Sequence, residues 1–165
     1  MKYLSQYASP LGGITMASDG KVLTGLWFDG QKYFGTGLTE GAEEKILPVF
    51  EETEKWLNGY FQRKEPKYLP PFRPEGSSFQ KEVWEILLAI PYGETLTYGE
   101  IAKIMASRRR LPGMSAQAVG GVVGRNPISI IIPCHRVIGK NGSLTGYAGG
   151  IEKKEWLLRL EKGIE

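Results

Sequence analysis

The sequence predicts an α+β protein in which a small β-rich part is followed by a helical part. Residues 1–36 contain several Tyr and Thr residues, one Val and one Trp, with glycines between them, which is typical of strands joined by turns. Residues 66–74 contain four prolines and can continue neither a helix nor a central strand, so they indicate a linker. After this linker, hydroxyl residues precede apolar stripes at helical spacing. We therefore expect two domains, residues 1–76 and 77–165.

The length and composition agree with two small globular domains. The chain has 165 residues, of which 41% are hydrophobic and 24% charged, so the composition does not favour a disordered or fibrous protein. The net charge of +3 permits an anionic partner without requiring one. One Cys and one His can form neither an internal disulfide nor a zinc site of Cys and His ligands, so we expect no metal. No apolar run approaches the ~18 residues of a membrane span, and the first ten residues lack the apolar core of a signal peptide. We expect a cytoplasmic protein without membrane contact.

The first domain contains a predicted hairpin and a predicted helix. Residues 14–18 and 22–28 are expected to pair across Asp19-Gly20, because an Asp-Gly pair tolerates the positive φ of tight hairpin turns. Apolar residues recur at three- and four-residue steps over residues 43–62, which predicts a helix. Pro48 lies inside this range and marks either an early helical position or a break.

Three hydroxyl residues of the second domain stand where helices are expected to begin: Ser77, Thr97 and Ser115. The first two are followed three positions later by Gln or Glu and so fit capping boxes. The third helix is expected over residues 116–124. Two short helices in succession favour a helix-turn-helix, although their connection, residues 107–114, is longer than the usual ~3 to 4 residues.

Three further segments complete the second domain. Residues 128–132 are β-branched at most positions and predict a short buried strand or extended segment. Five glycines between Gly139 and Gly150 predict a loop that can approach a ligand closely. The last helix is expected over residues 152–162.

The single Cys and the single His are adjacent, in the run Pro133-Cys134-His135-Arg136. A free Cys after an apolar strand is commonly a small core residue. Here two polar residues interrupt an otherwise apolar run, and a cationic neighbourhood is expected to lower the pKa of a thiol from its usual value of about 8.5. Adjacent strand residues face opposite ways, so Cys134 and His135 can touch only if the backbone turns between them.

The last helix supplies a candidate third member of this site. Leu157, Glu161 and Ile164 share one helical face, which places a carboxylate among apolar residues. A buried carboxylate needs a cation or several donors, and His135 is one available partner. One hypothesis is a Cys134-His135-Glu161 relay in which Glu161 fixes the imidazole and His135 activates the thiol. The alternative is that Glu161 is exposed to solvent near the chain end.

Taken together, these residues resemble the O6-alkylguanine-DNA alkyltransferase family. The resemblance rests on IIIPCHRVIG at 130–139, AVGG at 118–121, NP at 126–127, GYAGG at 146–150 and KEWLL at 154–158. It covers about residues 78–161 and is weak before Gly76. It implies a small N-terminal β-rich, ribonuclease-H-like domain followed by a helical, winged helix-turn-helix-like domain that carries the active site.

The resemblance implies direct-reversal DNA repair without a cofactor. The Cys134 thiolate would attack the alkyl carbon on guanine O6 and keep it, so one protein molecule is consumed per lesion. His135 would act as a base through a water, oriented by Glu161. The alkylated base would be flipped out of the duplex at a cost of a few kcal/mol. The implied partner is double-stranded DNA bound by a monomer, and O4-alkylthymine is a further candidate substrate.

The resemblance also assigns roles around the flipped base. Tyr98 would donate its hydroxyl to the guanine ring, and Asn126 would be a hinge between the DNA-binding helix and the cysteine segment. Without the resemblance, Tyr98 is an ordinary first-turn aromatic and Asn126 a residue that ends a helix. The expected substrate-binding residues are Tyr147, Ala148, Val137 and Arg136.

The expected DNA-binding surface combines the helix over 116–124 with the basic run before it. Its small side chains would let the helix approach the minor groove, and a tightly packed internal helix is the alternative. Gln117 stands where many family members have an arginine that fills the gap left by the flipped base. The run at 108–110 is expected either to contact phosphates or to be a solvated loop. The expected DNA-binding residues are Ser115, Ala116, Gln117, Ala118, Gly120, Arg108, Arg109 and Arg110.

Two other functions fit parts of this pattern. A non-catalytic protein that binds alkylated DNA as a flag for other repair would resemble the alkyltransferase-like proteins, but those replace the cysteine that is present here as Cys134. A cysteine hydrolase using Cys134, His135 and Glu161 would turn over repeatedly on small esters or amides.

Overall fold

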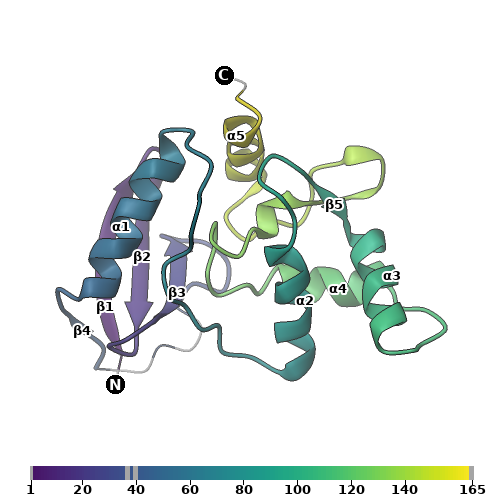
Figure 1. The fold of residues 1–165 in the computed structure, drawn as a ribbon, viewed down its shortest axis with the longest axis horizontal. Helices are drawn as coiled ribbons and strands as arrows, with labels where there is room; N and C mark the ends of the chain where they lie inside the picture. Colours follow the sequence, from purple (N-terminus) through teal and green to yellow (C-terminus); the bar gives the residue numbers. More distant parts are fainter. Residues whose placement is uncertain (1, 36–37, 39–40, 164–165) are drawn as a thin grey trace.

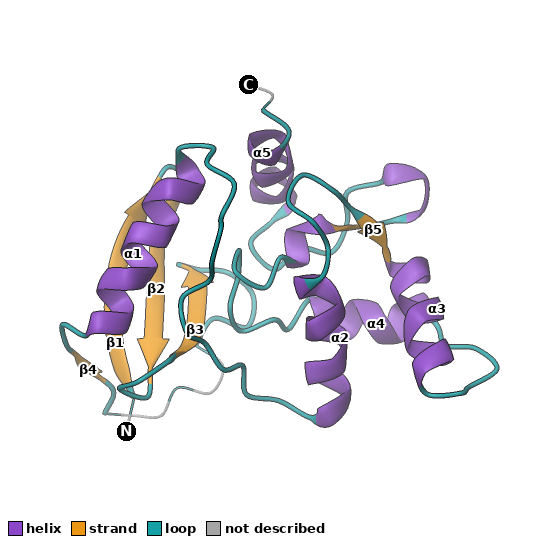
Figure 2. Ribbon diagram, in the orientation of Figure 1, coloured by secondary structure: helices purple, strands orange, loops and turns teal. Residues whose placement is uncertain are grey.

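The computed structural model describes residues 2–35, 38 and 41–163 and confirms the α+β class (Figure 1). A sheet and helix α1 form one side of the molecule, helices α2, α3 and α4 form the other, and α5 lies between them (Figures 1 and 2). None of the helices in this described part is long and apolar enough to cross a membrane.

In chain order the elements are β1 (Tyr3–Ser9), β2 (Gly12–Ser18), β3 (Leu23–Phe28), β4 (Glu43–Glu44), α1 (Pro48–Phe61), α2 (Ser78–Leu88), β5 (Leu96–Thr97), α3 (Tyr98–Arg108), α4 (Ala116–Val123), β6 (Val137–Ile138) and α5 (Ile151–Glu161).

The sheet has the strand order β3-β2-β1-β4, with β1 paired antiparallel to β2 and parallel to β4. The predicted hairpin is confirmed, because β2 and β3 pair antiparallel from Ile14 opposite Phe28 to Ser18 opposite Leu23. At its turn the Asp19 carboxylate accepts the backbone N–H groups of residues 21 and 22, and Gly20 has a φ of 108°. Strands β1 and β4 were not predicted from the sequence.

Helix α1 begins later than the sequence predicts. Residues 43 and 44 form β4, and the helix starts at Pro48, whose missing N–H costs nothing at a first helical position. The prediction of a helix from residue 43 is therefore wrong at its start, while its end at Phe61 agrees within one residue. One face of α1 is buried, and Tyr60 in its last turn is 1% exposed.

The three predicted helix starts of the second part are confirmed. Ser77 and Thr97 both form complete capping boxes, and the Ser115 hydroxyl accepts the backbone N–H of Ala118. Helices α3 and α4 pack against each other, as a helix-turn-helix requires. On α4 the valines are buried, whereas residues 115–118 are exposed. The hypothesis of a tightly packed internal helix is therefore wrong for this face of α4.

The segment 128–132 is buried but is not a strand, so this part of the prediction is wrong. The backbone makes only an isolated parallel bridge from Leu26 to Ile128 and then turns, with Ile130 at a φ of 70°. A left-handed conformation is rare for a β-branched residue. The Asn126 side chain holds the turn, since its amide donates to the carbonyl of Ile132 at 2.7 Å and its oxygen accepts the N–H of Ile128 at 2.9 Å. This turn leads directly into Pro133 and Cys134.

Helix α5 agrees with the prediction within one residue at each end. Leu157 and Glu161 on its inner face are buried, while Ile164 lies outside the described residues. The apolar core runs from the sheet to the helices without interruption, and the buried side chains of α5 join it.

Candidate active site

The backbone turns sharply at the cysteine. Residues Cys134–Arg136 form a single 3-10 turn between Pro133 and β6. Adjacent side chains in such a turn do not face opposite ways as they do in a strand. Cys134 is 5% exposed and His135 is fully buried, so both lie inside the protein.

Glu161 is the centre of a buried hydrogen-bond network. Its Oε2 atom lies 2.5 Å from His135 Nε2 and accepts the Tyr60 hydroxyl at 2.6 Å. Its Oε1 atom accepts the backbone N–H of Gly93 at 3.0 Å and Nε of Arg136 at 2.8 Å. The hypothesis of an exposed Glu161 is therefore wrong, and the predicted pairing of His135 with Glu161 is confirmed.

Burial and pairing set the charge states of this network. Burial opposes ionisation of Glu161, but the donors His135 and Arg136 outweigh it and hold the pKa of the carboxyl far below its usual range. Burial also lowers the pKa of His135 below its usual value, although Glu161 opposes this shift. The resting state is therefore a carboxylate beside a neutral imidazole.

Arg136 is part of this network. It does not line the surface hollow that Tyr147 and Ala148 form beside α4. Its guanidinium donates to both oxygens of Glu161 and to the carbonyl of Ile90 at 2.8 Å. In the substrate-free protein the Arg136 guanidinium thus neutralises the buried Glu161.

The thiol of Cys134 lies in a different environment from the one that the sequence suggests. Burial raises the pKa of the Cys134 thiol to about 11, although the Asn126 side chain and the Lys154 ammonium both lower it. The expected lowering by Arg136 does not occur, because that cation is paired with Glu161. The thiol is therefore protonated in the substrate-free protein, and a reaction at sulfur needs a base.

A second polar cluster joins Tyr98 to α5. The Tyr98 hydroxyl donates to the carbonyl of Thr145 at 3.0 Å, and the same carbonyl accepts the Lys154 ammonium at 2.7 Å. A Cβ at Gly146 would lie 3.1 Å from the Tyr98 hydroxyl, so glycine is needed for this approach. Burial raises the pKa of Tyr98 to about 12 and lowers the pKa of Lys154 to about 8.

A hollow of about 290 Å³ opens between the two parts of the molecule, beside α4. The predicted residues Gly120, Tyr147 and Ala148 line it together with Lys32 and Tyr33 from the segment after β3. The backbone N–H of Lys32 donates to the carbonyl of Ala148 at 3.1 Å and fixes that wall. Val137 lies next to the 3-10 turn in β6 and is buried.

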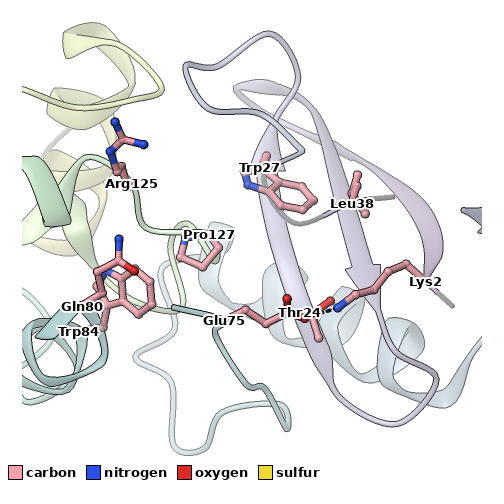
Figure 3. Close-up of a pocket in the computed structure, with 9 residues that line it drawn as sticks. All are labelled: Lys2, Thr24, Trp27, Leu38, Glu75, Gln80, Trp84, Arg125 and Pro127. Atoms are coloured by element: carbon pink, nitrogen blue, oxygen red, sulfur yellow. Dashed lines mark hydrogen bonds and ion pairs between the residues drawn. The ribbon is translucent and has the colours of Figure 1, made fainter. Parts of the chain in front are cut away.

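Another hollow, of about 110 Å³, lies in the seam between the sheet and α2 (Figure 3). Trp27 and Trp84 face it from opposite sides, and Lys2 pairs with Glu75 at its edge. None of the predicted site residues lines this hollow. The hollow beside α4, in contrast, is lined by the predicted substrate-binding residues Tyr147 and Ala148.

The expected DNA-binding residues lie at the end of α3, in the connection that follows it and in the first half of α4. Ser115, Ala116, Gln117 and Ala118 are exposed, and Gly120 is half-buried against the Tyr98 ring. Arg108, Arg109 and Arg110 are exposed as well. Arg109 is held by an ion pair with Glu82 at 3.0 Å and by the face of Phe79.

Reasoning from the sequence missed two side chains of these polar clusters, Lys154 and Tyr60. Lys154 lies on the same face of α5 as Leu157 and Glu161, so the helical spacing that identified Glu161 also applies to Lys154. Tyr60 lies in the apolar pattern of residues 43–62, which predicts a buried ring. The sequence carried no signal for its hydroxyl, because the contact with Glu161 spans 101 residues.

The chain is similar to known proteins along nearly its whole length. Residues 2–70 match the ribonuclease-like domain of 6-O-methylguanine DNA methyltransferase, and residues 78–163 match the DNA binding domain of the same family. The methylated-DNA–protein-cysteine methyltransferase of Haemophilus influenzae is 41% identical over 161 residues, which cover 97% of this chain and 86% of that one. The protein of the same name from Methanosarcina acetivorans is 43% identical, covering 96% and 97%. The crystal structure of Mycobacterium tuberculosis OGT in complex with DNA superposes with a TM-score of 0.83 at 42% identity, covering 98% and 93%.

Proposed function

Because this chain belongs to the 6-O-methylguanine DNA methyltransferase family, we propose that Cys134 receives the alkyl group of O6-alkylguanine in DNA. The protein is a DNA repair methyltransferase that binds DNA and reverses alkylation directly, by transfer to a cysteine of its own. One observation carries the assignment: the chain has a single cysteine, and that cysteine lies beside a buried His-Glu pair. The alkyl group stays on the sulfur, so each molecule acts once and no cofactor takes part.

The transfer exchanges a C–O bond for a C–S bond. A lone pair of the Cys134 sulfur attacks the alkyl carbon, and the bond from that carbon to O6 breaks with its electron pair passing to guanine. The thiol proton passes to His135 by way of a water, and Glu161 stabilises the imidazolium that forms. Tyr98 gives a proton to the guanine ring and regains one from solvent, while His135 releases the thiol proton to solvent and returns to the neutral imidazole, so no net proton is gained or lost. The products are a thioether and unmodified guanine.

The polar cluster around Thr145 supports this role of Tyr98. In the resting protein the Tyr98 hydroxyl donates to the carbonyl of Thr145, which also accepts Lys154. When a base enters, Tyr98 can turn its proton to the guanine ring while Lys154 still satisfies that carbonyl. The raised pKa of Tyr98 keeps the proton available at neutral pH.

The hollow lined by Tyr147 and Ala148 is proposed to take the flipped base. The Ala148 backbone N–H is proposed to donate to O6, and the carbonyls near Cys134 and Val137 are proposed acceptors for the exocyclic amine. Asn126 connects the end of α4 to the turn before Cys134 through two hydrogen bonds. A shift of α4 on DNA would thus be transmitted to the cysteine segment.

We propose that α4 enters the minor groove of double-stranded DNA. Its exposed positions carry small side chains, which permit a close backbone approach, and Gln117 is proposed to fill the gap left by the flipped base. Arg108 and Arg110 are proposed to contact phosphates. We further propose that the protein is a cytoplasmic monomer, that it also acts on O4-alkylthymine, and that its two domains are residues 1–76 and 77–165.

Intact mass after incubation with excess duplex DNA containing O6-methylguanine tests the assignment. The wild-type protein is expected to gain one methyl group and then stop, whereas Cys134→Ser is expected to gain none. An equal gain in the variant would refute the assigned acceptor. Continued release of repaired DNA would identify a hydrolase, and binding without transfer would identify a lesion-binding protein.

A further inference from the structure

Tyr60 reaches the catalytic pair from the opposite part of the molecule. It lies in the last turn of α1, 75 residues before His135 and 101 residues before Glu161 in the sequence. Its hydroxyl oxygen is 2.6 Å from Glu161 Oε2 and 3.3 Å from His135 Nε2. The hydroxyl therefore contacts both members of the pair that is proposed to take the thiol proton.

The surrounding aromatic rings fix the direction of this hydroxyl. The Tyr60 ring stacks on Trp56 with the centroids 5.4 Å apart, and Phe61 meets it edge-on at 5.5 Å. The His135 ring meets it edge-on at 6.4 Å. With the ring held on several sides, the oxygen cannot move far from Glu161 and His135.

A count of hydrogen-bond donors determines where the histidine proton lies. A phenol has one proton, and the Tyr60 proton is used in the 2.6 Å bond to the Glu161 carboxylate. Toward His135 the Tyr60 oxygen can then only accept, and the carboxylate can only accept as well. His135 Nε2 faces two acceptors and must carry a hydrogen, so in the neutral ring the lone pair lies on Nδ1.

We propose that Tyr60 is a positioning residue of the alkyl transfer, which together with Glu161 holds His135 in the tautomer protonated at Nε2 and leaves Nδ1 to accept the thiol proton. This inference rests on the proposed function for its chemical consequence. In the described part of the chain, His135 Nδ1 has no hydrogen-bond partner although the ring is fully buried. No protein group thus competes for the Nδ1 lone pair, which leaves it for the water through which the thiol proton is proposed to pass.

The other charged groups around His135 favour the same arrangement. Arg136 occupies the far oxygen of Glu161 and prevents the carboxylate from turning away. Arg136 and Lys154 both disfavour a second proton on the imidazole in the resting state. Burial and the adjacent Glu161 raise the pKa of Tyr60 well above its usual value, so its proton remains in the bond to Glu161 over the working pH range.

The single histidine of the chain makes the tautomer directly measurable. In protein labelled with ¹⁵N-histidine, one imidazole gives the whole ring-nitrogen NMR spectrum. At neutral pH the wild-type protein is expected to show a protonated Nε2 and an unprotonated Nδ1. A proton on Nδ1 would overturn the proposal without any variant, so this arm does not depend on the folding of a mutant.

Tyr60→Phe tests the hydroxyl itself, with Tyr7→Phe as the matched control. Tyr7 also donates a 2.6 Å hydrogen bond to a residue of α1, but its partner is Asn58, away from the site. We expect Tyr60→Phe to slow methyl transfer in single turnover about tenfold, the effect of removing one hydrogen bond to a charged group, with DNA affinity unchanged. The Nε2–H proton resonance should shift in Tyr60→Phe, because the hydroxyl that contacts both Nε2 and the Glu161 oxygen is gone, and stay in place in Tyr7→Phe.

The outcomes separate this proposal from the proposed function. If Tyr60→Phe matches Tyr7→Phe in both the transfer rate and the Nε2–H resonance, Tyr60 only supports the fold and the inference is wrong. If the wild-type protein transfers no methyl group, the proposed function fails, while the tautomer measurement still reports on Tyr60.

Discussion

Replacing Glu161 by Gln is expected to remove about 3–5 kcal/mol from the free energy of unfolding. The Glu161 side chain is fully buried and the Arg136 side chain is 10% exposed, so the substitution leaves a nearly buried guanidinium without its counter-charge. It also replaces one carboxylate oxygen by an amide NH₂, although both oxygens accept hydrogen bonds, from Tyr60 and His135 on one side and from Arg136 and Gly93 on the other. For a chain of this length the decrease corresponds to a fall in Tm of roughly 10 °C.

Glu82→Gln is the matched control for this prediction. Glu82 also pairs with an arginine, Arg109, but the two side chains are 24% and 36% exposed, so the decrease should stay within about 1 kcal/mol. Urea unfolding of both variants at pH 7, followed by tryptophan fluorescence, measures the difference. Equal decreases in the two variants would refute the argument that the Glu161 network is a buried, mutually dependent unit.

Three further outcomes follow from the charges in the site. Burial lowers the pKa of His135 in the folded state, where Tyr60 and Glu161 contact the ring and the Arg136 and Lys154 charges act on it, so the unfolded chain binds the extra proton. Stability should therefore be full above about pH 6.5 and fall below it by at most about 1.4 kcal/mol per pH unit. A urea midpoint unchanged from pH 7 to 5.5 would contradict this. Lys154→Met removes a cation that lowers the pKa of Cys134, so methyl transfer at pH 7.5 should slow about tenfold. The control variant Lys153→Met should transfer at the wild-type rate. Similar rates in both variants would show that Lys154 does not act on the thiol. Replacing Arg108 and Arg110 by Ala should reduce the slope of log affinity against log salt concentration by about 0.9 for each phosphate that the protein no longer neutralises. Arg109 is already paired with Glu82, so Arg109→Ala should leave this slope unchanged. The reverse result would assign the phosphate-binding role to Arg109.

The elements predicted correctly are those whose causes lie close together in the sequence. The bonds between Ser77 and Gln80 and between Thr97 and Glu100 join residues three positions apart, so the capping boxes could be identified directly. The Asp19-Gly20 turn is equally local. Strand β4, in contrast, depends on pairing with β1 about forty residues away, and no local signal marks its two glutamates.

The site was predicted where residue type and spacing coincide, and missed where a polar group has a long-range partner. Adjacent Cys134 and His135 and the apolar face around Glu161 were visible in the sequence, although its pattern left the burial of Glu161 open. The strand expected over 128–132 failed because the Asn126 amide clamps that segment into a turn, which outweighs the β-branched composition. Lys154 could have been found from its helical spacing, whereas the Tyr60 hydroxyl could not.

The distance in sequence between the parts of the site has a consequence during protein synthesis. His135 leaves the ribosome 26 residues before Glu161, and the nascent chain meanwhile carries its nucleophile and its imidazole without the carboxylate that orients them. Tyr60, made earlier still, meets the Glu161 carboxylate only when α5 emerges. A translation product cut short before that helix would carry the cysteine as an exposed thiol without the buried His-Glu pair, so the selective acceptor exists only once the last helix has been added.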